Sequence, residues 1–160
     1  MLARFPAMTQ FSIPDIGIIF GGVNDPANSI LQATTQANIE TMIQNLKDKG
    51  VTKIIVVTAQ FLNFSTGGDF DGSNNPKDET TCNYASVIVA QKAAAISKNV
   101  VVSDLFNFLR NRIVSGIDAK RSASWHVAGT DQHLNNYGCG LVADCILGTI
   151  QSQGWDTTLR

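Results

Sequence analysis

The sequence predicts an α/β fold in which helices cover both faces of a parallel β-sheet. Short runs of wholly apolar residues are typical of strands that are buried on both faces. Longer stretches with apolar residues at three- and four-residue steps are typical of amphipathic helices. Because the two patterns alternate along the chain, a three-layer α/β/α arrangement of parallel strands is expected.

The first strand, the first helix and the second strand are predicted within residues 16–58. Residues 16–20 form one apolar run, and residues 53–58, with four apolar residues between Lys53 and Thr58, are predicted as a second buried strand. The stretch 29–48 between them has helical spacing, and Gly50 suits the C-terminal end of that helix. The apolar positions of the helix are Ile30, Leu31, Ile39, Met42, Ile43 and Leu46.

The second half of the chain continues the alternation. Helices are expected over residues 82–98, 105–113 and 136–152, and a third strand is expected over residues 100–102. Residues 63–81 are rich in Asn, Ser, Gly and Asp, so a long surface loop is predicted there.

One folded domain is expected over residues 14–160, preceded by an N-terminal extension over residues 1–13. The hydrophobic content of 44% and the charged content of 16% exclude a disordered chain. A net charge of −1 without a basic stripe argues against a nucleic acid as partner. No apolar run approaches the roughly 18 residues of a membrane span, and the first residues lack the apolar stretch of a signal peptide. A cytoplasmic protein, or a part of a larger assembly such as a virion, is therefore expected.

The metal-binding motifs of other proteins have no counterpart in the sequence. Cys82, Cys139 and Cys145 do not have the spacing of a zinc site, so they are expected to be free thiols. The acidic stretch around Asp69 and Asp71 lacks the glycine and glutamate of a calcium loop. No metal and no cofactor is predicted.

The first of two motifs with chemical potential follows the first strand and reads Gly22-Val23-Asn24-Asp25. In open parallel sheets, ligands bind at the carboxyl ends of the strands. The side-chain amide of Asn24 suits donation to a developing oxyanion, which is worth about 3 kcal/mol in other hydrolases. Gly22 permits a tight turn. The alternative is ordinary turn chemistry, because Gly, Asn and Asp are common at strand ends.

The second motif, Asp131-Gln132-His133, stands shortly before the last helix. His133 suits the role of a general base near neutral pH, and Asp131 suits the role of orienting its ring. The alternative is a surface histidine without a catalytic role. The preceding loop carries Trp125 and His126, for which contact with a substrate and a structural role both remain open.

The two motifs on an alternating α/β chain resemble those of the SGNH hydrolases, also called GDSL-type esterases. The Gly22–Asp25 motif resembles the asparagine block of that family, and the Asp131–His133 motif resembles its block of aspartate and histidine. The run Pro14–Phe20 resembles the third strand of the family. The resemblance implies a flavodoxin-like sheet, with Asn24 and Gly22 in the oxyanion hole and with His133 and Asp131 as catalytic residues.

The family blocks that carry the nucleophilic serine and the oxyanion glycine have no recognisable counterpart in this chain. The nearest imitation ends in Ser73 but lacks a preceding apolar strand, so the nucleophile remains unknown. The family's sheet order implies two further strands beside residues 16–20. Without them this strand becomes an edge, and an exposed apolar edge favours association. A companion polypeptide or a neighbouring subunit is therefore expected to complete the sheet and to supply the serine.

The resemblance implies an ester hydrolase that removes acyl or acetyl groups from carbohydrates or other small esters with a Ser-His-Asp triad. The alternative is a non-catalytic carbohydrate-binding or assembly domain, for example of a phage tail protein, that retains the fold. Replacement of His133 by alanine distinguishes the two, because it abolishes turnover only in the hydrolase.

Overall fold

The computed structural model describes residues 13–63, 68–120, 125–126 and 133–156. These residues form two compact units. The sheet unit consists of the described residues within 13–59 and 86–103, and the helical unit consists of those within 60–85 and 104–156. The single domain expected over residues 14–160 stays a prediction.

The sheet unit contains three parallel strands in the order β1-β2-β3. β1 (Ile16–Phe20) pairs with β2 (Lys53–Val57) along its whole length, so that Phe20 lies opposite Val57. β3 (Val101–Ser103) pairs with the other side of β2. The parallel sheet and the α/β class predicted from the sequence are confirmed.

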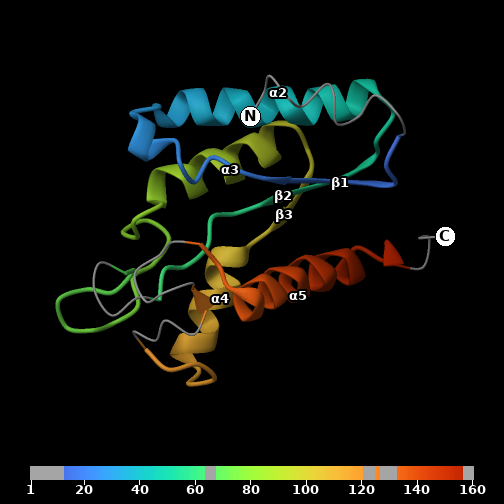
Figure 1. Ribbon diagram of the computed structural model, residues 1–160. Helices are drawn as coiled ribbons and strands as arrows, with labels where there is room; N and C mark the ends of the chain where they lie inside the picture. Colours follow the sequence, from blue (N-terminus) through green and yellow to red (C-terminus); the bar gives the residue numbers. More distant parts are fainter. Residues whose placement is uncertain (1–12, 64–67, 121–124, 127–132, 157–160) are drawn as a thin grey trace. The chain divides into compact units, whose positions relative to one another are not determined.

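Two helices, α2 (Gln32–Asp48) and α3 (Ala85–Ser97), pack on one face of the sheet, as Figure 1 shows. A cluster of buried apolar side chains joins them to the strands. Gly17 of β1 allows close packing, because a Cβ there would lie 2.6 Å from Cδ1 of Leu46. The buried cluster consists of Ile19, Ile39, Met42, Ile43, Leu46, Val51, Ile54, Val56, Ala94 and Ala95.

The other face of the sheet is buried unevenly. Ile55 and Val57 of β2 are 0% exposed, whereas their partners across the ladder, Ile18 and Phe20 of β1, are 48% and 39% exposed. Among the described residues, β1 has a neighbouring strand on one side only. The expectation that this strand lies at the edge of the sheet is therefore confirmed.

The helical unit contains α4 (Leu105–Val114) and α5 (Asn136–Ser152), which pack against each other. Phe61 contributes to its core, with ring centroids 5.5 Å from Phe70 and 5.4 Å from Phe106. The bounds of α5 are those predicted from the sequence.

The helix predicted from residue 29 begins later, at Gln32. A 3-10 helix, η2 (Pro26–Asn28), stands before it, and Ser29 has a left-handed φ of 57°. Leu31 is then extended and provides the N-cap of α2. The backbone conformation of Ser29 and Leu31 therefore sets the start of the helix, and the spacing of apolar residues does not predict it.

The polar stretch predicted as a surface loop lies partly inside the helical unit. Asp69 is 0% exposed and Phe70 is 5% exposed. The carboxylate of Asp69 accepts from the backbone N–H groups of Leu62, over 2.8 Å, and Asn83, over 2.7 Å. The prediction was wrong for these residues because a buried carboxylate can replace an apolar side chain where backbone donors surround it.

Candidate active site

A tight turn leads the chain away from the carboxyl end of β1. Gly22 has a φ of +94°, and its carbonyl accepts from the backbone N–H of Asp25 over 2.9 Å. A Cβ at Gly22 would lie only 3.1 Å from Cγ2 of Thr35. The turn therefore requires glycine both for its backbone conformation and for its space.

Asn24 stands at the exposed tip of this turn. Its carbonyl accepts from the backbone N–H of Asn28 over 3.2 Å and from Nδ2 of Asn28 over 2.7 Å. Within the described part of the chain, no residue forms a hydrogen bond with the side-chain amide of Asn24. The backbone of Asn24 is thus fixed, while its side chain remains free to donate to a ligand.

Asp25 ties the turn to the following helix. Its carboxylate accepts from the hydroxyl of Thr35 over 2.7 Å, and its carbonyl accepts from the backbone N–H of Ile30 over 2.9 Å. These bonds support an ordered loop around Asn24.

A second support comes from Gln91 of α3, which is 0% exposed. Its Nε2 donates to the carbonyl of Gly21 over 2.7 Å, and its Oε1 accepts from the backbone N–H of Ala59 over 2.8 Å. One side chain therefore links the residue that follows β1 to the chain that leaves β2.

In the helical unit, the backbone that follows His133 is held firmly. His133 itself is exposed, and the next residue, Leu134, forms an antiparallel bridge with His126. The backbone N–H of Asn135 donates to the carbonyl of Trp125 over 2.9 Å. The side chain of Asn135 caps α5 by accepting from the N–H of Gly138 over 2.9 Å, and it donates to the carbonyl of His126 over 3.2 Å.

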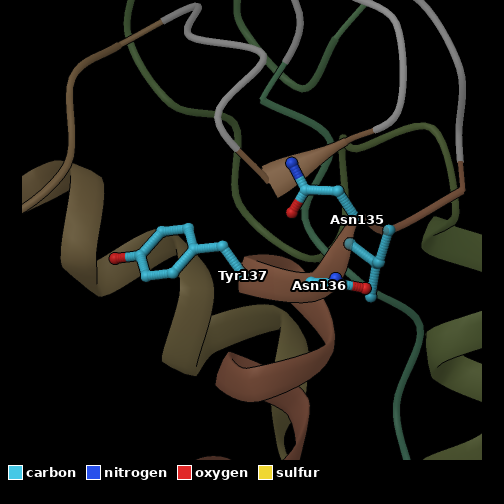
Figure 2. Close-up of a pocket in the computed structure, with 4 residues that line it drawn as sticks. Asn135, Asn136 and Tyr137 are labelled. Atoms are coloured by element: carbon cyan, nitrogen blue, oxygen red, sulfur yellow. The ribbon is translucent and has the colours of Figure 1, made fainter.

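A surface pocket of about 490 Å³ lies beside the start of α5 and is lined by Leu134, Asn135, Asn136 and Tyr137. Figure 2 shows the three labelled side chains leaving the first turn of α5 in different directions. The hydroxyl of Tyr137 accepts from the guanidinium of Arg112 over 2.9 Å, which fixes the ring. This pocket directly follows His133 in the sequence.

Trp125 and His126 are 0% and 3% exposed. Their burial favours the structural role over contact with a substrate, which stays a prediction. Asp131 lies outside the described residues, so its role as partner of His133 also stays a prediction. One residue separates Asp131 from His133 in this chain, whereas two separate the pair in the Asp-x-x-His block of the SGNH family.

The buried carboxylate of Asp69 has a raised pKa. Burial raises it most, and the hydrogen bonds from Asn83 and Leu62 oppose the rise. Burial, together with the charge of Asp69, raises the pKa of the Cys82 thiol to about 11. Asp69 acts as a structural link between Leu62 and Asn83, because its carboxylate accepts from the backbone N–H groups of both.

Ser73 lies nearby in the sequence, and its backbone N–H donates to Asp71 in an exposed turn.

The described residues contain no group of three or more His, Cys, Asp or Glu side chains that could hold a metal ion. None of the helices in the described ranges is long and apolar enough to cross a membrane. All three cysteines are free thiols, with Cys139 exposed and Cys82 and Cys145 buried.

Several solved structures of other proteins share this architecture. No protein-family model and no curated protein matches the sequence. Protein YXIM of Bacillus subtilis matches in structure with a TM-score of 0.75 and 21% identity, over 94% of this chain and 41% of its own. A lipase/acylhydrolase of Enterococcus faecalis matches with a TM-score of 0.65 and 21% identity, over 95% of this chain and 69% of its own. An acetyl xylan esterase of Geobacillus stearothermophilus matches with a TM-score of 0.68 and 16% identity, over 92% of this chain and 65% of its own.

A GDSL-like lipase of Parabacteroides merdae matches in the same way, with a TM-score of 0.66 and 14% identity, over 96% of this chain. This chain has the SGNH-hydrolase fold. The SGNH fold resemblance inferred from the two motifs is thereby confirmed at the level of structure. The chain spans from about two fifths to about two thirds of the matched chains, 41% of the first and 69% of the second.

On the SGNH fold, the predicted site residues fall into two groups. Gly22 and Asn24 share one turn of the sheet unit, and His133 stands before α5 of the helical unit. Sequence reasoning missed Gln91. Its signal was a polar residue four positions after Val87, on the face of α3 that also carries the buried Ala94.

Proposed function

We propose that this chain is part of a serine ester hydrolase of the SGNH type. The observation that supports the proposal most is the likeness of its fold to that of esterases over 92% to 95% of the chain. The turn at Gly22 and Asn24 adds local support, because its free side-chain amide stands at the carboxyl end of β1, where parallel sheets bind ligands.

The reaction is acyl transfer through a serine that lies outside this chain. The serine oxygen attacks the ester carbonyl carbon while His133 accepts the hydroxyl proton. The bond to the alcohol oxygen then breaks, and His133 returns the proton to that oxygen. Water attacks the acyl-serine in the same way, which releases the acid and restores the serine. Asp131 orients His133 throughout.

The negative charge that develops on the carbonyl oxygen is stabilised by Nδ2 of Asn24 and by the backbone N–H of Gly22. Donors that are already in place act most strongly, because they need no reorganisation in the transition state. The hydrogen bonds that fix the backbone of Asn24 and the carboxylate of Asp25 support such an arrangement.

The substrate class is an acetyl ester of a carbohydrate or another small ester. A matched structure described as an acetyl xylan esterase supports this choice. The polar start of α5, where Asn136 and Tyr137 line a surface pocket that follows His133 in the sequence, is suited to an alcohol that carries hydroxyl groups.

A companion polypeptide or a neighbouring subunit supplies the serine and pairs with the edge of β1 that has no neighbouring strand among the described residues. Ile18 and Phe20 support this part of the proposal, because they leave apolar surface exposed beside the fully buried Ile55 and Val57. We expect the added segment to bury both of these exposed side chains in the complete enzyme.

The test is labelling with a fluorophosphonate probe, followed by intact-mass measurement of every polypeptide that purifies with the chain. We expect an adduct on a companion polypeptide, and no adduct when His133→Ala replaces the native chain. An exposed control variant, Gln44→Ala, should label like the native protein.

The other outcomes are equally informative. An adduct on this chain itself would overturn a companion polypeptide of different sequence as the source of the serine and leave the hydrolase. The absence of any adduct from folded protein would overturn the hydrolase and favour the binding or assembly domain, for which His133→Ala leaves binding intact.

A further inference from the structure

Gln91 places an amide where α3 is otherwise apolar. Val87, Ala90 and Ala94 are buried on the same helix, and Gln91 is also 0% exposed. Burial of an amide is costly unless both its donor and its acceptor are satisfied. Here both are satisfied by backbone groups, the carbonyl of Gly21 and the N–H of Ala59, which belong to two different strand connections.

The position of these two backbone groups follows from the register of the sheet. Phe20 lies opposite Val57, so the next pair in register is Gly21 with Thr58. The N–H of Thr58 donates to Ser103 on the β3 side, which directs the N–H of Ala59 toward the β1 side. In a continued parallel ladder, the carbonyl of Gly21 would accept directly from the N–H of Ala59.

The side-chain amide of Gln91 occupies the place of that hydrogen bond. It accepts from Ala59 over 2.8 Å and donates to Gly21 over 2.7 Å, so the ladder continues through the amide at a larger separation of the strands. The two chains are therefore held apart, but in a fixed relation, at the carboxyl end of the sheet.

The turn that carries Asn24 begins at this point. The carbonyl of Gly21 belongs to the peptide group that precedes the φ of +94° at Gly22, so its orientation sets the direction in which the turn leaves β1. Two residues later the chain reaches the exposed amide of Asn24.

We infer that Gln91 is a positioning residue for Asn24, which it orients by inserting its amide between Gly21 and Ala59 where β1 and β2 part. The consequence of this positioning for catalysis rests on the proposed function. The effect of Gln91 on the turn does not rest on the proposed function, because it is a property of the sheet unit alone.

The first experiment measures the turn by NMR. In Gln91→Met, which keeps the length of the side chain but removes both hydrogen-bonding groups, we expect shifted or broadened backbone signals for residues 22–25. We also expect exchange of the Ala59 amide hydrogen to become at least tenfold faster. The exposed Gln44→Met is the matched control and should leave these signals unchanged. Unchanged signals for residues 22–25 in folded Gln91→Met would overturn the inference.

Gln91→Glu separates the two bonds if the methionine variant does not fold. At a pH at which the introduced carboxyl group is ionised, it still accepts from Ala59 but no longer donates to Gly21, so the turn should change while Ala59 stays protected. The native protein gives a measurement that needs no variant. The side-chain amide hydrogens of Gln91 should exchange at least 100-fold more slowly than those of Gln44, and equal rates would overturn the inference.

The second experiment tests the link to Asn24 with p-nitrophenyl acetate as the probe. In the complete enzyme, Gln91→Met should lower kcat at least tenfold with KM changed less than twofold. In an Asn24→Ala background the same change should cost less than twofold, because the residue that it positions is gone. Equal losses in both backgrounds would overturn the link. If the native enzyme shows no turnover, the proposed function fails, and the NMR measurements still decide whether Gln91 positions the turn.

Discussion

The hydroxyl of Thr35 donates a 2.7 Å hydrogen bond to Oδ2 of Asp25, and this bond joins the first turn of α2 to the loop that follows β1. Thr35 is 2% exposed, so the bond is sheltered from water on the donor side. The bond is one of the contacts that give the Asn24 turn a defined shape.

Thr35→Val keeps the shape of the side chain and removes this donor. We expect the free energy of unfolding to fall by about 1–3 kcal/mol, because a carboxylate loses a partner in a partly buried site. Urea unfolding measures the change. Thr41→Val on the exposed side of α2 is the control, and equal losses in the two variants would contradict the prediction.

Asn24→Ala should lower kcat by about 100- to 1,000-fold in the complete enzyme, as the loss of one oxyanion donor does elsewhere. The free energy of unfolding should stay nearly unchanged, because the side chain is exposed. Steady-state kinetics and urea unfolding on the same sample measure the two effects. Asn24→Asp provides a stricter comparison, since it keeps the size but places a negative charge beside the oxyanion. Turnover of the aspartate variant at the native rate would exclude the oxyanion role.

Gly138→Ala should destabilise the helical unit, because its Cβ would overlap the carbonyl oxygen of Trp125. The backbone of Trp125 is itself held by the N–H of Asn135, so it cannot move away without the loss of that bond. Gly140→Ala, in the same helix but with open space around it, should instead stabilise the protein by about 0.5–1 kcal/mol. Thermal unfolding compares the two, and a shift of both midpoints in the same direction would refute the close approach.

The raised pKa of Asp69 predicts a pH dependence of stability. A carboxyl group whose folded pKa lies above its ordinary value of 3.8 binds its proton more tightly in the folded state. Its contribution is fully present below the ordinary value and is lost as the pH rises through the folded pKa. The free energy of unfolding of the native protein, relative to that of Asp69→Asn, should therefore increase as the pH falls through this window.

Asp69→Asn should also lose stability at neutral pH. The asparagine side chain has only one acceptor oxygen, so the backbone N–H of either Leu62 or Asn83 then faces an NH2 group and loses its hydrogen bond. Urea unfolding from pH 7 down to pH 4 measures both effects. A constant difference between the two proteins over this range would show that Asp69 titrates normally.

The sequence predicted the elements of the fold well because burial leaves a clear pattern. Residues 16–20 and 54–57 are apolar throughout, and residues 54–57 are buried on both faces of the sheet. The last helix, α5, has the bounds that were expected. The start of α2 was misplaced, because a positive φ at Ser29 leaves no trace in apolar spacing.

The candidate site was predictable only in part. Gly22 and Asn24 follow the end of a strand, where parallel sheets bind ligands, so their residue types alone indicate a candidate site. Gln91 was missed because it is a polar residue whose partners, the backbone groups of Gly21 and Ala59, are distant in the sequence. No local pattern encodes such a contact, which exists only after the strands have paired.

The connection of β1 to β2 through α2 has a consequence for the order in which the protein folds. Eight of the ten residues of the buried cluster lie between Ile19 and Val56. Pairing β1 with β2 nevertheless joins residues 37 positions apart, such as Ile16 and Lys53, and such long-range pairing slows the closing of this strand–helix–strand segment. The other two residues of the cluster, Ala94 and Ala95, belong to α3. We expect Gln91 to complete the open end of this strand pair only after β1 and β2 have paired, because its amide bonds to a residue beyond each of the two strands.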